Sequence, residues 1–346
     1  MRILLGMSGG LDSTYAALLL KEAGHEVEGA VLVMHGYTEL DAARESAQAL
    51  GIPLHVVDCR ELFNNTVIPN FIEEYGKGRT PNPCVICNSD VKFKALLDFA
   101  RANGFDKIAT GHYARIISRN SDGKIRHTLA RATDSGKDQT YMLWRLSEDV
   151  LSSLVLPLAD VKKSDARERA HEQSLVAADR EESQEICFIP DGDYASFIEE
   201  RVGASTEGSF VDSDGRVLGR HKGIIHYTVG QRKGLGIALG ARAFVTEIRP
   251  DKNEVVLSFI PKSTEKVRVF KIHFLGIGEP RVGEEMRLTV KLRYLAPPVS
   301  CTVKYLGDGC AQLVLDTPAR SVTPGQSAVF YDGDELVFGG LVDLVN

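Results

Sequence analysis

The sequence contains no apolar run close to the roughly 20 residues that a membrane-spanning helix needs. It also lacks internal repeats and low-complexity tracts, and it begins with a strand-like segment instead of the charged and then apolar pattern of a secretory leader. We therefore expect neither a membrane protein nor a secreted one, and the cytoplasm is the expected compartment. The 346 residues exceed one ordinary core and favour two or three domains.

Positive charge is scarce over the whole chain, with 41 Lys and Arg against 47 Asp and Glu. It is unevenly spread, because residues 1–203 have a net charge of -8 whereas residues 204–264 have a net charge of +3. Local charge governs the attraction to a phosphate backbone, so a basic stripe at 216–233 is compatible with RNA binding, or with an ordinary solvated face. The stripe holds no acidic residue and comprises Arg216, Arg220, Lys222, Arg232 and Lys233.

The six cysteines give no evidence for a disulfide framework, because a cytosolic chain keeps its thiols reduced. Their surroundings divide them into two groups. One group lies among alternating apolar residues, where a small buried side chain is expected. The other lies in loop-like segments with prolines. The first group is Cys59, Cys301 and Cys310, and the second is Cys84, Cys87 and Cys187.

A glycine-rich turn at residues 6–13 separates an apolar strand at 2–5 from a helical pattern at 14–21, which Gly24 would end. Such a turn binds phosphate, because glycines let the backbone approach and the helix start attracts anions. It lacks the Gly-Lys-Ser/Thr ending of a Walker A loop, and it is not G-x-G-x-x-G. Ser-Gly-Gly-Leu-Asp-Ser instead resembles the PP-loop of ATP pyrophosphatases. That resemblance implies that Ser8 and Ser13 hold phosphate oxygens and that Asp12 lies near Mg²⁺.

The first 110 residues alternate between strand and helix patterns, which predicts a doubly wound parallel sheet. Such sheets bind ligands at the carboxyl ends of their strands, so Met34, Gly111 and His112 should share a site with the glycine-rich turn. The predicted strands are 2–5, 27–34, 54–57 and 107–110, and the predicted helices are 14–21, 40–50, 61–75 and 91–102.

The second part of the chain changes in character. We expect a β-hairpin over 114–135 that turns at 120–123, and short helices at 148–155 and 165–173, the latter capped by Ser164. From Gly208 onward only short alternating runs with turns remain, which indicates all-β structure. The fold expected is an α/β doubly wound parallel-sheet PP-loop domain followed by a small β-rich domain and a C-terminal β-barrel. Their expected bounds are 1–203, 204–264 and 265–346.

Two of the loop-like cysteines lie in Thr-Pro-Asn-Pro-Cys-Val-Ile-Cys-Asn at 80–88, where the prolines favour an extended, surface-facing segment. Cys87 would lie just before a helix starting near Val91, and the helix field together with Lys92 and Lys94 would lower its thiol pKa. Cys187 follows 100 residues later. Two thiols that meet suit persulfide exchange, in which one carries sulfur and the other attacks. With Cys84 they also suit an iron–sulfur site with one open iron.

The PP-loop together with TPNPCVIC and SQEICFIP resembles the tRNA-specific 2-thiouridylases (MnmA/TrmU type). Further matching segments follow in order along essentially the whole chain. They are residues 111–115 (GHYAR), 136–141 (GKDQTY), 228–236 (TVGQRKGLG), 292–298 (LRYLAPP) and 325–331 (GQSAVFY).

The resemblance implies an enzyme that uses ATP and Mg²⁺ to adenylate the C2 oxygen of the wobble uridine of tRNA and then replaces this oxygen with sulfur. Cys187 would carry the sulfur as a persulfide supplied by a relay that begins at a cysteine desulfurase, and Cys87 would be the nucleophile, with Asp12 also in the catalytic set. The nucleotide would be bound by Gly6, Met7, Ser8, Gly9, Gly10, Leu11, Asp12, Ser13, Met34 and Gly111.

The resemblance also implies tRNA contacts, although His112 could be an ordinary turn histidine and residues 137–139 a polar turn. Family members carry Asp or Cys at position 84, and Cys here keeps a [4Fe-4S] cluster on the three thiols open as the alternative to the favoured persulfide route. Less favoured rivals are another PP-loop ligase that uses ammonia and a tRNA-binding protein without activity. The implied tRNA contacts are Asn82, Pro83, Cys84, His112, Lys137, Asp138, Gln139, Arg293, Tyr294 and Gln326.

Overall fold

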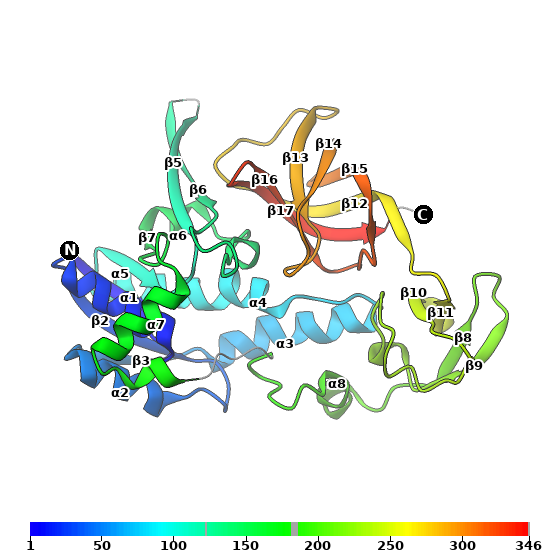
Figure 1. The fold of residues 1–346 in the computed structure, drawn as a ribbon, viewed down its shortest axis with the longest axis horizontal. Helices are drawn as coiled ribbons and strands as arrows, with labels where there is room; N and C mark the ends of the chain where they lie inside the picture. Colours follow the sequence, from blue (N-terminus) through cyan, green and yellow to red (C-terminus); the bar gives the residue numbers. More distant parts are fainter. Residues whose placement is uncertain (122, 181–185, 345–346) are drawn as a thin grey trace.

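A five-stranded parallel sheet forms one end of the molecule (Figure 1). The computed structural model describes residues 1–121, 123–180 and 186–344. The strand order β3-β2-β1-β4-β7 places the first strand at the centre, which confirms the predicted doubly wound arrangement. The strands are β1 (Arg2–Gly6), β2 (Glu26–Val33), β3 (Leu54–Asp58), β4 (Lys107–Thr110) and β7 (Leu154–Val155).

Helices cover both faces of this sheet because its central strand is apolar on both sides. Ile3 and Leu5 pack with three helices on one face, whereas Leu4 packs with α5 (Phe93–Ala102) on the other. The three helices of the first face are α1 (Leu11–Glu22), α2 (Leu40–Leu50) and α7 (Lys163–Glu172).

The helix predicted at 91–102 begins eight residues earlier than expected. Asn82 caps α4 (Pro83–Ile86) by accepting a hydrogen bond from the Cys84 N–H at 3.2 Å, and a proline occupies the first helical position. A π-helical turn (η1, Cys87–Lys92) then joins α4 to α5. The prediction that Cys87 precedes the helix was wrong, because the Asn-Pro pair that reads as a turn is a helix start.

Three further details differ from the sequence-based expectation. Ser164 is not a cap, since Lys162 precedes α7 and the Ser164 hydroxyl instead donates to Asp165 at 2.8 Å. The helix α6 (Glu148–Ser153) ends early because its last predicted residues form β7. The helix α8 (Tyr194–Val202) was not predicted, although Asp193 caps it by accepting from Ser196 N at 3.1 Å.

The predicted hairpin is present as β5 (Arg115–Ser121) and β6 (Lys124–Ala130); residue 122 of its turn and residues 183–185 of the SQEICFIP motif lie outside the described residues. The strand β6 pairs with β17 of the barrel at Ala130 and Glu335, and the Thr128 hydroxyl of β6 donates to the Leu336 carbonyl. Within the described part of the chain, no helix is both long and apolar enough to cross a membrane. Short 3₁₀ helices are η2 (Thr140–Met142), η3 (Val176–Asp179), η4 (Ile224–His226) and η5 (Pro250–Lys252).

Two β-rich units complete the molecule, as predicted from the loss of helical patterns after Gly208. The central unit is a four-stranded sheet in the order β10-β11-β8-β9, and the C-terminal unit is a barrel that closes where β12 pairs with β17. The central strands are β8 (Gly208–Val211), β9 (Val217–His221), β10 (Phe244–Arg249) and β11 (Glu254–Ser258). The barrel strands are β12 (Ser263–Phe274), β13 (Glu285–Lys291), β14 (Val299–Gly307), β15 (Cys310–Arg320), β16 (Ser327–Asp332) and β17 (Glu335–Leu344).

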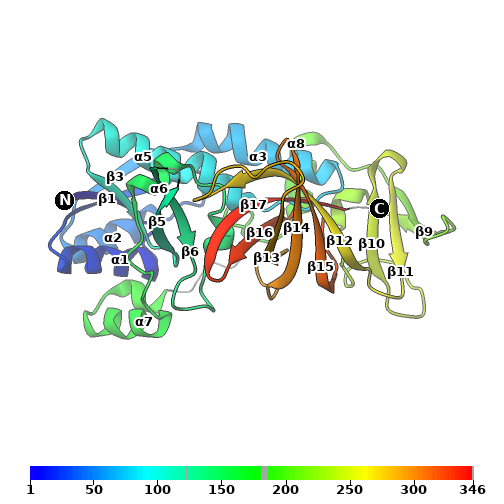
Figure 2. The ribbon, with the colours of Figure 1, turned by 90° about the horizontal axis from the view of Figure 1, so that it is seen from above.

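One long helix, α3 (Arg60–Gly76), reaches from the parallel sheet towards both β-rich units (Figure 1). The barrel lies between the parallel sheet and the central unit in the perpendicular view (Figure 2). The chain returns from the far end of α3 through residues 77–82 into α4, so the cysteine-bearing segment begins where the three parts meet.

Candidate active site

The glycine-rich turn has the form of a phosphate-binding loop. Gly9 has a φ of +83°, and a Cβ there would lie 2.3 Å from the backbone of Ala42, so only glycine fits. Ser13 Oγ accepts from Ser8 N at 3.2 Å and donates to the Gly10 carbonyl at 3.1 Å. The turn thus holds its own shape at the start of the 12-residue helix α1, where free backbone N–H groups attract anions.

Asp12 lies under this loop with two partners that the sequence did not reveal. Lys163 Nζ donates to Asp12 Oδ1 at 2.5 Å, and the Tyr113 hydroxyl donates to the same oxygen at 3.1 Å. Lys163 is 8 % exposed and comes from the start of α7, 151 residues later in the chain. This arrangement places a buried ammonium beside the loop that would hold phosphates. No motif marks Lys163, because its sequence context resembles an ordinary charged helix.

A second unpredicted cation holds the loop from the opposite side. Arg180 donates to the carbonyls of Gly9 and Ala42, the latter at 3.0 Å, and to the Glu45 carboxylate at 2.5 Å. The Ser46 hydroxyl donates to the same Gly9 carbonyl at 3.2 Å. These bonds direct the Gly9 carbonyl away from the phosphate side of the loop, which leaves the N–H groups as its anion-binding surface.

The strand ends meet at this loop as the parallel-sheet rule predicts. A Cβ on Gly111 would lie 2.7 Å from the backbone of Asp12, so the segment after β4 presses directly against the loop. His112 donates or accepts at Thr110 Oγ1, 2.8 Å away, and packs on Phe93. Burial lowers the pKa of His112 to about 3, so its ring is neutral at physiological pH.

Met34 lies at the carboxyl end of β2 and contacts one of the thiols. It follows β2 at the same edge of the sheet, and its Sδ lies 3.5 Å from Cys87 Sγ. Cys87 is 7 % exposed and belongs to a hydrophobic cluster with Phe63, Phe71 and Val91. The second cysteine of the motif is thus a buried thiol against a thioether.

Burial raises the pKa of Cys87 to about 12, and nearby thiols raise it further while Lys92 opposes the shift. The expectation of a lowered pKa at Cys87 was therefore wrong for this structure. The helix field that should lower it is absent, since Cys87 lies inside a continuous helical segment and not at its start. The charge of Lys92 is present but is outweighed by desolvation.

Cys187 lies in a turn close to the same cluster. It keeps exposed surface, while its neighbours Phe188 and Ile189 are buried in the cluster that contains Cys87 and Met34. Desolvation raises the pKa of Cys187, and the charge of Cys84 adds to this shift. Cys84 is also exposed at the surface, and desolvation raises its pKa as well. The three thiols therefore share one neighbourhood, with Cys87 inside and the other two at the rim.

The three cysteines do not form a metal-binding group in this arrangement. Among residues 1–121, 123–180 and 186–344, no three His, Cys, Asp or Glu side chains converge in a way that could hold a metal ion. The donor set therefore does not fit a cluster here, and we derive no step through one. Of the remaining cysteines, Cys59 and Cys301 are buried as predicted, whereas Cys310 is half-buried.

The burial of Cys87 has a measurable consequence in the enzyme without substrates. A thiol with a pKa near 12 is protonated at pH 8, so we expect its alkylation rate to rise steadily between pH 8 and 10 without the plateau of an ordinary thiol of pKa about 8.5. Cys187 should react faster throughout, because it is exposed. Mass spectrometry of iodoacetamide-labelled peptides would measure both rates. A plateau for Cys87 below pH 9 would contradict the burial seen here.

Several residues expected to contact tRNA are buried or half-buried and interact with other residues of the protein. Asp138 is 6 % exposed and accepts from the Thr140 hydroxyl at 2.8 Å, whereas Gln139 Oε1 accepts from Tyr113 N at 2.9 Å. Both stabilise the turn that follows the hairpin. Lys137 and Tyr294 are half-buried, and the Tyr294 ring lies 5.9 Å from that of Tyr141.

Two other predicted contacts join the β-rich units to each other or to the catalytic part. Arg293 donates to the Val229 carbonyl at 2.9 Å and to the Thr323 hydroxyl, which links the central unit to the barrel. Gln326 Nε2 donates to the Thr80 carbonyl at 2.8 Å, just before the cysteine segment. Their tRNA contacts stay predictions, and the internal bonds were not foreseen, because sequence does not show which surfaces meet.

A parallel sheet whose first strand leads through a glycine-rich loop into a helix, with a buried lysine beside that loop, defines a domain of the PP-loop class. The chain matches the family models described as tRNA methyl transferase HUP domain over residues 1–191, tRNA methyl transferase PRC-barrel domain over 195–258 and Aminomethyltransferase beta-barrel domain over 264–342.

Curated relatives match the chain over its full length. It is 43% identical to the tRNA-specific 2-thiouridylase MnmA of Carboxydothermus hydrogenoformans, covering 99% of this chain and 97% of that protein. It is also 43% identical to the protein of that name from Acetivibrio thermocellus, with 99% of each chain covered. The chain belongs to the tRNA-specific 2-thiouridylase family, as its motifs indicated.

Proposed function

We propose that this protein catalyses the ATP-dependent 2-thiolation of the wobble uridine of tRNA with sulfur held as a cysteine persulfide. The observation that carries the proposal is the contact between Met34 and Cys87, 3.5 Å between sulfur atoms, which places the thiol cluster at the carboxyl edge of the sheet that also carries the glycine-rich loop. An enzyme that activates a carbonyl with ATP and then delivers sulfur needs these two groups within one site.

The residues of the loop fit ATP with Mg²⁺. The loop offers N–H groups and the start of α1 to the phosphates, with Met34 and Gly111 at the nucleotide. Asp12 would lie nearest the metal ion, which proteins typically hold with one or two carboxylates and the substrate phosphates. The ion neutralises phosphate charge when bound, and Lys163 holds Asp12 in place for it.

Adenylation converts the C2 oxygen of the uridine into part of a leaving group. The uridine C2 oxygen attacks the α-phosphorus of ATP, the bond to the β-phosphate breaks, and pyrophosphate and the N3 proton leave. Electrostatic stabilisation of the transferring group falls to the loop N–H groups and to Lys163. The target base must leave its stack to reach this point, with Asn82, Pro83 and Cys84 beside it.

Sulfur transfer then uses both thiols. The terminal sulfur of the Cys187 persulfide attacks C2, the C2–O bond breaks and AMP leaves. The Cys87 thiolate attacks Cys187 Sγ, the bond between this atom and the transferred sulfur breaks, and 2-thiouridine regains its N3 proton. A Cys87–Cys187 disulfide remains, which a cellular dithiol reduces. Because Cys87 is buried and protonated here, tRNA binding must expose it before this step.

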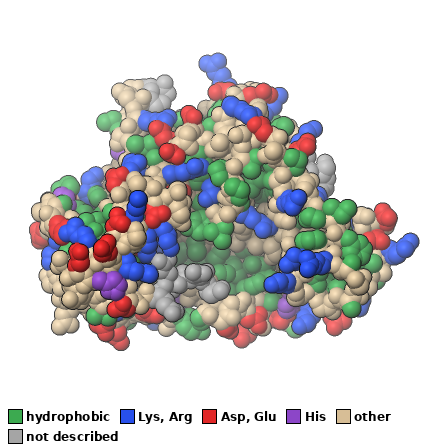
Figure 3. Space-filling model, viewed as in Figure 1, with side chains coloured by type: hydrophobic (Ala, Val, Ile, Leu, Met, Phe, Trp, Pro, Cys, Tyr) green, Lys and Arg blue, Asp and Glu red, His purple; other side chains and the backbone are tan. Residues whose placement is uncertain are grey.

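The three parts of the chain, which we place at 1–203, 204–264 and 265–346, would divide the work. The first binds ATP and carries the thiols, and the two β-rich units bind tRNA together with His112, Lys137, Asp138, Gln139, Arg293, Tyr294 and Gln326. Figure 3 shows a hollow between the three parts, with a mainly hydrophobic floor and Lys or Arg side chains on its flanks. A cysteine desulfurase or a sulfur-relay protein would supply the persulfide, in the cytoplasm.

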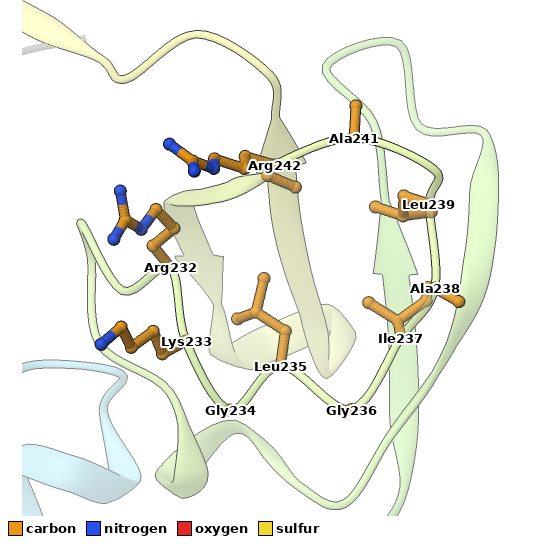
Figure 4. A pocket seen from close by; sticks show the side chains of 11 residues that line it. Arg232, Lys233, Gly234, Leu235, Gly236, Ile237, Ala238, Leu239, Ala241 and Arg242 are labelled. Atoms are coloured by element: carbon orange, nitrogen blue, oxygen red, sulfur yellow. The ribbon is translucent and has the colours of Figure 1, made fainter.

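A loop of the central unit presents part of the predicted basic stripe. It surrounds a cavity of about 700 Å³ lined by residues 232–239 and 241–243, without an acidic side chain. Arg232, Lys233 and Arg242 are exposed, and their side chains point to the same side of the loop (Figure 4). Three cations without a neighbouring carboxylate on the loop suit the phosphates of an RNA stem.

Removing these three charges should weaken tRNA binding and its salt dependence together. The slope of log K for tRNA binding against log salt is negative, and we expect Arg232→Ala, Lys233→Ala and Arg242→Ala each to make it less negative by roughly 0.7 to 0.9 for each phosphate that the side chain neutralises. Filter binding at several salt concentrations measures this slope. Lys252→Ala, an exposed lysine of the same unit outside the cavity lining, is the control. Unchanged slopes in all three variants would place the tRNA elsewhere.

The direct test of the proposed function is reconstitution. The purified protein would be given unmodified tRNA, Mg-ATP, cysteine and a cysteine desulfurase, and 2-thiouridine, AMP and pyrophosphate would be measured. Iron-free protein that forms all three supports the persulfide route. Activity that requires iron would favour the cluster, and product formed from ammonia would identify an amidating ligase instead.

A further inference from the structure

Residues 78–81, which we call the joint, carry the chain from the end of α3 into the cysteine segment and are enclosed by both β-rich units. Gly78 has a φ of +67°, and a Cβ there would lie 2.8 Å from Ile248 of the central unit. Gly325 of the barrel has a φ of +87°, and a Cβ there would lie 3.0 Å from Thr80 N. Glycine at 78 makes room for the side chains of Ile248 and Pro250, and glycine at 325 lets the barrel backbone approach that of Thr80.

Thr80 uses every polar group it has to bind the other two units. Its N–H donates to the Pro324 carbonyl at 2.9 Å, and its carbonyl accepts from Gln326 Nε2 at 2.8 Å; both partners belong to the barrel. Its hydroxyl donates to the Thr228 hydroxyl of the central unit at 3.2 Å. Arg79 adds a contact to Asp343 of β17 at 3.4 Å. The joint is thus fixed by residues far from it in sequence.

A short and stiff path leads from Thr80 to the thiols. Pro81 and Pro83 each fix one backbone angle, and Gln326 also approaches the Pro81 carbonyl at 3.5 Å. Asn82, between them, caps α4 through the Cys84 N–H at 3.2 Å and donates from Nδ2 to Met142 Sδ at 3.3 Å. A displacement of Thr80 therefore moves the start of α4, because few freely rotating backbone dihedral angles separate the two.

Resting on the proposed function, we propose that Thr80 is a positioning residue for the sulfur-transfer step. The central unit and the barrel, through Thr228 and Gln326, hold the joint so that Cys84 and Cys87 are placed correctly only when both units are docked. The β-rich units then set the geometry of the thiols in addition to binding tRNA. ATP binding should be independent of the joint, because α2, Arg180 and Lys163 hold the PP-loop.

The test removes the hydrogen bond between the Thr80 and Thr228 hydroxyls by substituting either residue. Thr80→Val and Thr228→Val each remove the bond between the two hydroxyls, and Thr80→Ser retains a hydroxyl. Thr246→Val is the matched control, because the Thr246 hydroxyl donates within its own unit, to the Val256 carbonyl at 3.3 Å. For each variant we would measure kcat for 2-thiouridine, the Kd for tRNA, the Kd for ATP, the melting temperature and the alkylation rate of Cys87.

We expect both valine variants to lower kcat by about tenfold, since misplacement of about 1 Å can reduce a rate by up to 100-fold. The Kd values for tRNA and for ATP should stay within about twofold of the wild type, and the melting temperature should not change. The alkylation rate of Cys87 should change. The double variant should be no worse than Thr228→Val, since Thr80→Val removes only a hydroxyl bond that Thr228→Val already lacks, whereas Thr228→Val also loses a hydrogen bond with Tyr194. Thr80→Ser should restore kcat, and Thr246→Val should resemble the wild type.

Other outcomes would overturn the inference. A weaker tRNA Kd with unchanged kcat and unchanged Cys87 alkylation would mean that the β-rich units only bind tRNA. Additive losses in the double variant would show that Thr80 and Thr228 act separately. Failure of the proposed function gives a different result, because the wild-type protein itself would then form no 2-thiouridine. The alkylation rate of Cys87 in the variants would still test whether the joint positions the thiols. Thr228→Val keeps the test in place should Thr80→Val fold poorly.

Discussion

Cys187→Ser is expected to lower 2-thiouridine formation by roughly a thousandfold or more, the scale on which the loss of a covalent nucleophile reduces turnover. A serine cannot carry a persulfide, so the transferable sulfur is missing while the nucleotide loop is untouched. AMP and pyrophosphate formation in the presence of tRNA should therefore continue. Mass spectrometry of the tRNA nucleosides, run beside an assay for pyrophosphate, measures the two steps separately.

Cys87→Ser should lower the release of 2-thiouridine product as strongly as Cys187→Ser lowers its formation. The intermediate that accumulates distinguishes the roles of the two thiols. Without Cys87 the transferred sulfur remains bonded to Cys187, so we expect tRNA to accumulate as a covalent adduct that a reductant releases. Cys310→Ser is the matched control, because Cys310 is a half-buried thiol of the barrel with no place in the site. Full activity in Cys187→Ser would exclude the persulfide role, and equal losses in Cys310→Ser would indicate general destabilisation.

Lys163→Met should lower the tRNA-dependent formation of AMP and pyrophosphate by about 100-fold or more, the range seen when an electrostatic stabiliser of a transition state is removed. Methionine retains much of the length and apolar stem of lysine but leaves Asp12 without its ammonium partner at 2.5 Å. The rate of the adenylation step should fall, whereas tRNA binding should not. A quench assay of pyrophosphate release under single-turnover conditions measures this rate.

The neighbouring lysine supplies the control for this prediction. Lys162 is exposed and precedes the first residue of α7, so Lys162→Met removes the same charge without touching Asp12. Equal rates of pyrophosphate release in Lys163→Met and Lys162→Met would show that Lys163 contributes only through the net charge of the protein. A normal rate of pyrophosphate release with a weaker affinity for ATP would restrict Lys163 to substrate binding.

Local patterns were sufficient for most of the catalytic fold. The helix predicted at 40–50 has those bounds in the structure, and the strand predicted at 107–110 agrees residue for residue with β4. Apolar periodicity determines such elements because each buries a face defined by nearby residues. The error at α4 arose from a competing local signal, since the prolines at 81 and 83 read as a turn although the second occupies the first position of a helix.

Many residues of the candidate site could also be predicted from the sequence. The glycine-rich turn between strand and helix indicated the phosphate loop, and the carboxyl-edge rule placed Met34, Gly111 and His112 beside it. The resemblance named the two thiols. Their chemical state was not readable, because the pKa of Cys87 depends on burial by side chains from α3 and from the segment after Cys187.

The α/β part, the two β-rich units and the glycine-rich loop followed from the sequence alone, since each depends on a periodicity or a short contiguous motif; the roles of Cys87 and Cys187 stay predictions from the resemblance. Only the tertiary structure placed Lys163 on Asp12, Arg180 on Gly9 and Thr80 between two other units. These bonds join residues that are 148 to 246 positions apart along the chain. Nothing local encodes such pairs, because they form only when separately folded surfaces pack together.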